Sequence, residues 1–222
     1  MLIGIGIFCI ALVGVFGLVC WRARGAEWGA RGVNWVDGFL RLFCRHYHRL
    51  HGATLCLPRS GPAIVVANHV SGLDPFLLIA ASPRPLRFLM AREQYERFGL
   101  QWLFRAAGCI PVDRDRNPAR ALRAAAQALQ RGEVVAVFPQ GGIQAPGVPG
   151  LPLKGGAIRL AKRYKCAIYV AHLRGIRRVG HLVTPLLLRG NVCIDAHPPL
   201  ECAEHVDHAT CMRAMGALIL RE

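Results

Sequence analysis

The hydrophobic positions along the chain fall into two different patterns on either side of residue 52. The N-terminal part opens with an uncharged run of twenty residues, Leu2 to Trp21 (LIGIGIFCIALVGVFGLVCW). A helix of that length is about 30 Å long, which matches the hydrocarbon core of a bilayer. The pattern therefore predicts a hydrophobic membrane helix over these residues.

A second segment, residues 33–50, interleaves large apolar residues with arginines (VNWVDGFLRLFCRHYHRL). This mixture predicts an amphipathic helix that lies at the membrane interface. The two segments could instead form a helical hairpin that enters one leaflet, and both arrangements attach the chain to the membrane. A cleaved signal peptide would show a basic start and a shorter apolar run, and no basic side chain precedes Leu2.

Arginines follow the apolar run closely, beginning with Arg22 and Arg24. Because cytoplasmic flanks of membrane helices carry an excess of such residues, we expect the bulk of the chain on the cytoplasmic face of the cell membrane. Residues 1–52 are accordingly predicted to form a membrane anchor with an amphipathic helix. Residues 53–222 are predicted to form one domain, which is long enough to bury a core.

From residue 53 onward, short apolar runs alternate with helical stretches. The predicted strands are Ala63–Ala67, Leu86–Met90, Cys109–Val112, Val134–Phe138, Ala167–His172 and Asn191–Ala196. The predicted helices are Asp74–Ala81, Arg92–Ala107, Pro118–Arg131, Lys154–Lys165 and Ala203–Leu220. Such alternation is typical of an α/β fold whose strands are buried on both faces. The long Gly- and Pro-rich segment 140–153 has the length of a functional loop.

Composition narrows the classes of protein that fit. A hydrophobic fraction of 53% and a mean hydropathy of +0.31 exclude a disordered chain. The net charge of +15 favours anionic partners, such as a membrane surface, a phosphorylated substrate or nucleic acid. The nine cysteines are scattered and form no CxxC pair, so they are interpreted as reduced, buried small hydrophobes.

The candidate chemistry begins where the first predicted strand ends, at Asn68 to Pro75 (NHVSGLDP). His69 lies at the carboxyl end of a strand, where α/β proteins commonly build sites. A carboxylate five residues later, Asp74, can fix the tautomer of that imidazole and stabilise its protonated form. No serine or cysteine is placed as a nucleophile, so His69 would activate an external hydroxyl. Alternatively, the two residues merely cap a turn and a helix.

Three motifs that follow one another along the chain favour the catalytic interpretation over simple capping. They are NHVSGLDP, then GCIPVDR (residues 108–114), then FPQGG (residues 138–142). Together they resemble the phospholipid/glycerol acyltransferase family, whose best-known members are the 1-acyl-glycerol-3-phosphate acyltransferases. The resemblance covers roughly residues 50–200 and matches the first motif at Asn68, His69 and Asp74. It implies an α/β fold with a mixed sheet flanked by helices, and a catalytic pair formed by His69 and Asp74.

The third motif departs from the family's Phe-Pro-Glu-Gly-Thr-Arg, because Gln140 replaces the glutamate and Ile143 the arginine. The resemblance places this motif beside the acceptor, and the predicted substrate-binding residues are Asn68, Arg114, Gln140, Gly141, Gly142 and Lys154. Arg114 is expected to contact a phosphate, since a guanidinium fork binds phosphate bidentately. Lys154, or an arginine elsewhere, would supply a second charge. Backbone N–H groups near Gly141 and Gly142 would hold an oxyanion.

The implied reaction moves a fatty acyl group from acyl-CoA or acyl-carrier protein to the hydroxyl of a lysophospholipid in phospholipid biosynthesis. The expected acceptor is 1-acylglycerol-3-phosphate. His69 would take the hydroxyl proton and Asp74 would orient His69. No metal and no cofactor beyond the acyl donor is expected. The partners are membrane lipids and the two substrates, without nucleic acid.

Alternatives from other classes stay open at this point. The altered third motif would suit an acceptor without a terminal phosphate, or a catalytically silent lipid-binding relative. The charge would suit a nucleic-acid binder, but no helix-turn-helix, zinc-finger or RNA-binding signature is present. The metal-ligand types at Cys202, His205, His208 and Cys211 would span about 13.5 Å on a helix, too far to share one ion. The Gly-rich stretch ending at Lys154 lacks the Ser or Thr of a Walker A loop.

Overall fold

The computed structural model describes residues 2–113, 118–147, 150–202 and 205–220. Within these ranges the chain forms one sheet of seven strands in the order β1-β7-β6-β2-β5-β3-β4. The strands are β1 (His51–Gly52), β2 (Ala63–Ala67), β3 (Leu86–Ala91), β4 (Ile110–Val112), β5 (Val134–Val137), β6 (Ile168–Arg174) and β7 (Cys193–Ala196). All neighbours run parallel except β6 and β7, so the predicted α/β fold with a mixed sheet is confirmed.

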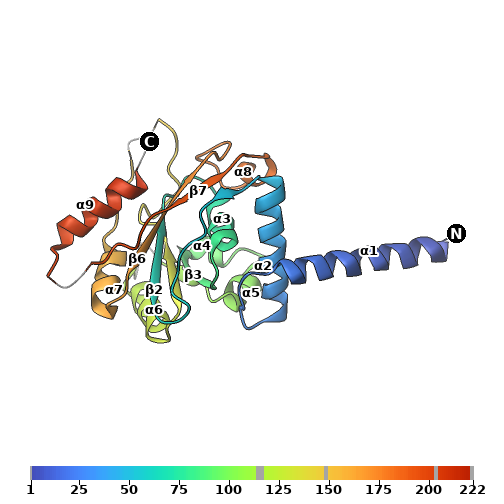
Figure 1. The fold of residues 1–222 in the computed structure, drawn as a ribbon, viewed down its shortest axis with the longest axis horizontal. Coiled ribbons are helices and arrows are strands. Elements are labelled where there is room, and N and C mark those ends of the chain that lie inside the picture. Colours follow the sequence, from blue (N-terminus) through green and yellow to red (C-terminus); the bar gives the residue numbers. More distant parts are fainter. Residues whose placement is uncertain (1, 114–117, 148–149, 203–204, 221–222) are drawn as a thin grey trace.

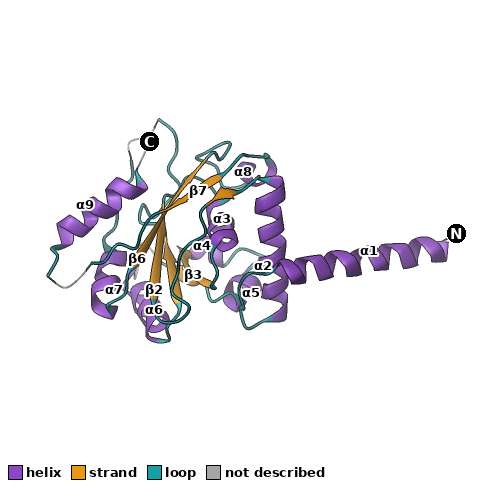
Figure 2. Cartoon of the chain, viewed as in Figure 1, coloured by secondary structure: helices purple, strands orange, loops and turns teal. Residues whose placement is uncertain are grey.

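Helices flank both faces of this sheet (Figure 2). In chain order they are α1 (Leu2–Ala23), α2 (Arg31–Leu42), the π-helical turn η1 (Phe43–Tyr47), α3 (Asp74–Ala81), α4 (Arg92–Tyr95), α5 (Gln101–Ala106), α6 (Pro118–Gln130), α7 (Gly156–Tyr164), α8 (Thr184–Leu187) and α9 (His208–Ile219). The predicted helix over 92–107 is thus split in two. The one predicted from Ala203 begins at His208, where the Asp207 side chain caps it by accepting from the N–H groups of Ala209 and Thr210.

The alternation of side chains along the central strand explains why the sheet carries two cores. Ala63, Val65 and Ala67 of β2 join the core beneath α2 and α3. Ile64 and Val66 join the core beneath α6, α7 and α9. Because successive residues of a strand face opposite sides, a fully apolar strand requires cover on both faces. The site described below lies at the carboxyl end of this strand.

Helix α1 extends away from the rest of the molecule (Figure 1) and exposes apolar side chains such as Ile10 and Val13. Its C-terminal part crosses α2 at Gly38, where a Cβ atom would lie 1.7 Å from the Cys20 carbonyl oxygen. A helix over the predicted residues is therefore present. Among the described residues, however, no helix has both the length and the apolar character needed to cross a membrane. The predicted spanning role is not confirmed.

The predicted amphipathic segment is helical through α2 and η1 and carries an aromatic row on its outer side. Trp35, Phe39, Phe43 and Tyr47 stack in sequence, with ring centroids 6.0, 6.0 and 5.3 Å apart. Phe16 of α1 meets the same row edge-on. The opposite side of the segment is buried against the sheet domain. A helical conformation over most of residues 33–50 is confirmed, and the place of this segment at the membrane interface stays a prediction.

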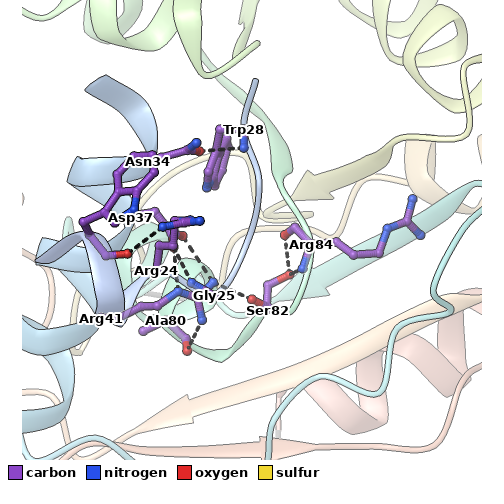
Figure 3. A network of polar contacts seen from close by, with 10 residues as sticks. Arg24, Gly25, Trp28, Asn34, Asp37, Arg41, Ala80, Ser82 and Arg84 are labelled. Carbon is purple, nitrogen blue, oxygen red and sulfur yellow. Dashed lines mark hydrogen bonds and ion pairs between the residues drawn. The ribbon is translucent and has the colours of Figure 1, made fainter. Parts of the chain in front are cut away.

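A buried ion pair fastens α2 to the end of α3 (Figure 3). Arg41 Nε donates to Asp37 Oδ2 at 2.8 Å, and the same guanidinium donates to the carbonyl oxygens of Ala80 and Ser82 at 3.0 and 2.6 Å. Asp37 also accepts from the Gly25 N–H at 2.8 Å. Carbonyl groups at a helix C-terminus have no partner within the helix, and Arg41 supplies one.

The division of the chain into two parts at residue 52 stays a prediction.

Candidate active site

The segment between β2 and α3 brings His69 and Asp74 together. His69 Nδ1 lies 2.8 Å from Asp74 Oδ2, and Asp74 is the first residue of α3. The Asp74 side chain is fully buried, whereas the His69 side chain is 18% exposed. Since Nδ1 is occupied by the carboxylate, Nε2 is the ring nitrogen left for a reactant.

The Asp74 carboxylate also closes the turn that separates the two residues. Its Oδ2 atom accepts from the N–H groups of Val70 and Ser71 at 2.7 and 2.9 Å, and its Oδ1 atom accepts from the Ser71 hydroxyl at 2.5 Å. These contacts explain the spacing in physical terms, because the intervening residues wrap their own donors around the carboxylate. We call residues 69–74 the catalytic turn, after the catalytic role that the sequence predicts for His69 and Asp74. The Asp74 side chain makes no capping hydrogen bond to α3, so the alternative that it merely caps a helix is wrong.

Neighbouring strands fix the orientation of the imidazole. The Phe138 ring, which follows β5, stacks on His69 with centroids 4.1 Å apart and planes 16° apart. Stacking on one side and the carboxylate at Nδ1 leave the ring little rotational freedom. Sequence reasoning missed Phe138 and Ser71 as supporting residues. The signals were present, since Phe138 opens the FPQGG motif and Ser71 lies between His69 and Asp74.

The side chains of Gln140 and Asn68 form hydrogen bonds with backbone groups. Gln140 is 5% exposed, and its Oε1 atom accepts from the His69 N–H at 2.6 Å. The Asn68 amide donates to the Leu173 carbonyl at 2.8 Å and accepts from the Leu173 N–H at 2.7 Å. These two residues therefore position His69 and the end of β6. Their predicted contact with substrate stays a prediction.

The third motif brings Lys154 close to the same place. The Lys154 N–H donates to the Pro139 carbonyl at 2.9 Å, and a Cβ atom at Gly141 would lie 2.8 Å from Lys154 Nζ. The Gly141 N–H donates to the Phe138 carbonyl at 3.0 Å, so this predicted oxyanion donor is already used. The Gly142 N–H remains as the candidate.

The second motif lies farther away than the other two. β4 is the edge strand of the sheet, and β3 and β5 separate it from β2. Asp113 forms a long ion pair with Arg92, at 3.5 Å. Arg114, the predicted phosphate ligand, lies outside the described residues.

Two loops are hydrogen-bonded to the catalytic turn. The Gln144 N–H donates to the His69 carbonyl at 2.7 Å, from the loop that follows β5. From the loop that follows β6, the Gly180 N–H donates to the Val70 carbonyl at 2.7 Å. In the same loop the His181 carbonyl accepts from the Gly72 N–H at 3.1 Å. A Cβ atom at Gly72 would lie 1.9 Å from the Leu182 carbonyl oxygen, so only glycine fits this contact.

Other candidate sites in the described residues lack comparable chemistry. No group of three His, Cys, Asp or Glu side chains there is arranged to hold a metal ion. A surface hollow of about 420 Å³ is lined by residues that include Lys165, Cys166, Cys202 and His205. It begins beside the amino end of β6 and includes none of the predicted site residues.

Comparisons with known proteins identify the family and the fold. A family model described as Acyltransferase matches residues 50–173, which is more than half of the chain. The probable 1-acyl-sn-glycerol-3-phosphate acyltransferase of Mycoplasma pneumoniae is 31% identical over 129 residues, covering 54% of this chain and 46% of the relative. The 1-acyl-sn-glycerol-3-phosphate acyltransferase of Bacillus subtilis is 23% identical over 120 residues, covering 54% and 59%.

The chain thus spans about half the length of these curated relatives. A solved structure, the 1-acyl-sn-glycerophosphate acyltransferase PlsC from Thermotoga maritima, superposes with a TM-score of 0.62 at 19% identity. The superposition covers 86% of this chain and 83% of that one, and it supports the fold. On the family match, together with the paired His69 and Asp74, the chain belongs to the acyltransferase family.

Proposed function

We propose that the chain transfers a fatty acyl group from a thioester to the hydroxyl of a lysophospholipid, with 1-acylglycerol-3-phosphate as the expected acceptor. The observation that carries the proposal is the 2.8 Å contact between His69 Nδ1 and the buried Asp74 carboxylate. The names of the Mycoplasma pneumoniae and Bacillus subtilis relatives support the acceptor class. The acyl donor is acyl-CoA or acyl-carrier protein, used as a co-substrate.

In the proposed reaction, His69 Nε2 takes the proton from the acceptor hydroxyl while its oxygen attacks the thioester carbonyl carbon. Asp74 stabilises the resulting imidazolium through Nδ1. The carbonyl oxygen becomes an oxyanion, for which the Gly142 N–H is the candidate donor. The tetrahedral intermediate then collapses, the carbon–sulfur bond breaks, and the departing thiolate receives the proton from His69. General-base help of this kind is worth about 10²–10⁴-fold in rate.

The apolar side chains of α1 and the aromatic row of α2 and η1 support attachment to a lipid surface. Ile10, Val13 and Phe16 are exposed on α1, and Phe39 and Tyr47 are exposed on the aromatic row. Aromatic rings and arginines are the side chains that favour the headgroup region of a bilayer. In this proposal the chain works at the cytoplasmic face of the cell membrane, where a lysophospholipid reaches His69 without leaving the lipid phase.

His69→Ala and Asp74→Asn test the function directly. We expect turnover of acyl-CoA with lysophosphatidate to fall about 10³-fold for His69→Ala and about 10²-fold for Asp74→Asn, because the first removes the base and the second its carboxylate partner. The purified full chain in detergent is assayed by mass spectrometry of the product lipid. His205→Ala, an exposed histidine outside the site, is the matched control and should keep wild-type turnover.

Circular dichroism and thermal melting show whether each variant is folded. Near-normal turnover of a folded His69→Ala chain would remove the proposed base. A wild-type chain that binds lysophospholipid but transfers no acyl group would identify a silent lipid-binding relative. Comparison of lysophosphatidate with neutral and zwitterionic acceptors decides whether a terminal phosphate is needed.

A further inference from the structure

The loop that follows β6 carries positive charge to the catalytic turn. We call residues 175–183 the arginine loop, because Arg177 and Arg178 lie at its centre. It leaves β6 at the carboxyl end, the same end of the sheet at which β2 delivers His69, since the two strands are parallel. Its Gly180 and His181 backbone groups bond to Val70 and Gly72. Arg178 thus precedes by two residues the Gly180 N–H that bonds to the catalytic turn.

The contacts of the arginine loop also fix its backbone. Arg178 has φ = +57°, a left-handed conformation that non-glycine residues rarely adopt. Gly180 lies against the 140–153 loop, with a Cβ position 3.2 Å from the Ala145 Cα atom. A strained residue persists where the surrounding structure imposes it, and such residues concentrate at functional sites. The arginine loop is therefore held in one shape between two other loops of the site.

The charge of the two arginines is not neutralised by the described protein. Arg177 and Arg178 are exposed and form no ion pair with any carboxylate of the described residues, whereas the adjacent Arg174 pairs with Asp195 at 2.7 Å. The other loop that touches the catalytic turn has no Lys or Arg over residues 140–147 (QGGIQAPG), and the cation beside it is Lys154, whose Nζ lies next to Gly141. Unpaired guanidinium groups on a loop that contacts the catalytic turn have the charge and the planar set of donors to bind a phosphate.

We propose that Arg177 and Arg178 form a phosphate-binding site for the substrate that reacts at His69. The proposal rests on the transfer function above and assigns its phosphate recognition to the arginine loop. Gly180 is two residues from Arg178, and a chain spans at most about 3.6 Å per residue, so Arg178 Cα is about 7 Å or less from Gly180 Cα. Both arginine side chains are exposed and long enough to reach a ligand that is held beside the catalytic turn. The phosphate belongs either to the acceptor lipid or to coenzyme A.

The test compares Arg177→Gln/Arg178→Gln with Arg59→Gln/Arg163→Gln in the detergent-purified full chain. The control pair removes the same charge from exposed residues at the opposite end of the sheet, before β2 and at the end of α7. We expect the arginine-loop variant to raise the KM of one substrate about 10–100-fold, with kcat within about twofold, since the lost hydrogen bonds to phosphate stabilise the bound substrate and the transition state equally.

KM values for substrates with and without a phosphate identify which substrate carries the phosphate that is bound. A raised KM for lysophosphatidate but not for monoacylglycerol assigns the site to the acceptor. A raised KM for acyl-CoA but not for an acyl-pantetheine thioester assigns it to the donor. An unchanged KM for all substrates relative to the control pair overturns the proposal, as does a loss confined to binding of phosphatidylglycerol vesicles.

A binding measurement separates this proposal from the transfer function itself. Isothermal titration of wild type and both variants uses glycerol 3-phosphate and coenzyme A as probes. If wild type transfers no acyl group, weaker binding of either probe to the arginine-loop variant alone still supports the phosphate site. If neither probe binds wild type more tightly than that variant, the proposal is wrong whatever the activity.

Discussion

Gln140 acts on His69 through the main chain. Its side-chain oxygen accepts from the His69 N–H at 2.6 Å, and its burial removes any competing water. Loss of this acceptor would leave a buried N–H without a partner next to the reacting ring. Gln140 is in this respect a positioning residue, because it holds the backbone from which the imidazole extends.

Replacement of Gln140 by leucine and by glutamate separates these effects. We expect Gln140→Leu to lower kcat about tenfold with little change in KM, since an unsatisfied buried donor costs about 1–3 kcal/mol and displaces the ring. Gln140→Glu keeps an acceptor at the same place and should retain more of the kcat than the leucine variant. Steady-state kinetics of folded protein checks both. Equal losses in the two variants would show that the acceptor at this position does not matter.

Sequence spacing was sufficient for His69 and Asp74 because a five-residue turn brings them together locally. It was insufficient for Asn68 and Gln140, whose partners lie 105 and 71 residues away. Polar side chains that satisfy distant backbone groups look the same in sequence as side chains that bind a ligand. The position of the arginine loop could not be predicted from the sequence either, since only the fold shows that this loop contacts Val70 and Gly72.

Among the elements, α2 combines two roles on opposite sides. Its outer side carries the aromatic row, while its inner side buries Asp37 and Arg41 against the C-terminus of α3. Because α3 begins at Asp74, the ion pair at its other end attaches the aromatic row to the helix that supplies the carboxylate. This connection makes α2 part of the domain core.

Arg41→Met is expected to lower the free energy of unfolding by about 3–5 kcal/mol, because it leaves the buried Asp37 carboxylate without its charged partner. Arg174→Met, which breaks the exposed pair with Asp195, should cost about 1 kcal/mol or less. Urea unfolding in a fixed detergent measures both. The double variant Asp37→Asn/Arg41→Met should cost less than the sum of the single changes. Strict additivity would mean that the two side chains do not stabilise each other.

Elements with strong local patterns were predicted well. β2 has the predicted bounds, and the other predicted strands shift by only one or two residues at either end. β1 was missed because it consists of two exposed residues and, within the described part of the chain, pairs with β7 alone. The helix expected from Ala203 begins later because the Asp207 side chain caps it.

For the whole molecule, burial separates the cysteines into two reactivity classes. Burial raises the pKa of Cys44 to about 12 and that of Cys109 and Cys166 to about 11. A raised pKa keeps the thiol protonated, and the protonated thiol is a poor nucleophile. Cys56 is exposed.

Iodoacetamide at pH 8 should therefore label Cys56 in the folded chain well before Cys44, Cys109 or Cys166. Peptide mass spectrometry over time measures the order, and labelling in urea should remove the difference. Cys56→Ser should abolish the adduct at residue 56 without changing the others. Rapid modification of Cys44 in the native state would contradict the burial of that thiol.

Strand order could not be derived from the sequence, because it depends on which apolar strands pair across long separations. β2 alone pairs with strands that begin 71 and 105 residues after it. The α/β class follows from local alternation, whereas the order follows from the packing of two cores.

The pairing of β1 with β7 has a consequence for synthesis. His51 of β1 pairs with Cys193 of β7, so β1 cannot form this pairing until β7 has been synthesised. At about 5–20 residues per second, the intervening chain takes roughly 7–28 s to be made. Until then the edges of β1 and β6 are open, and open edges capture strands from other chains. A chain truncated before residue 193 keeps those edges permanently, so aggregation of such fragments is the expected result.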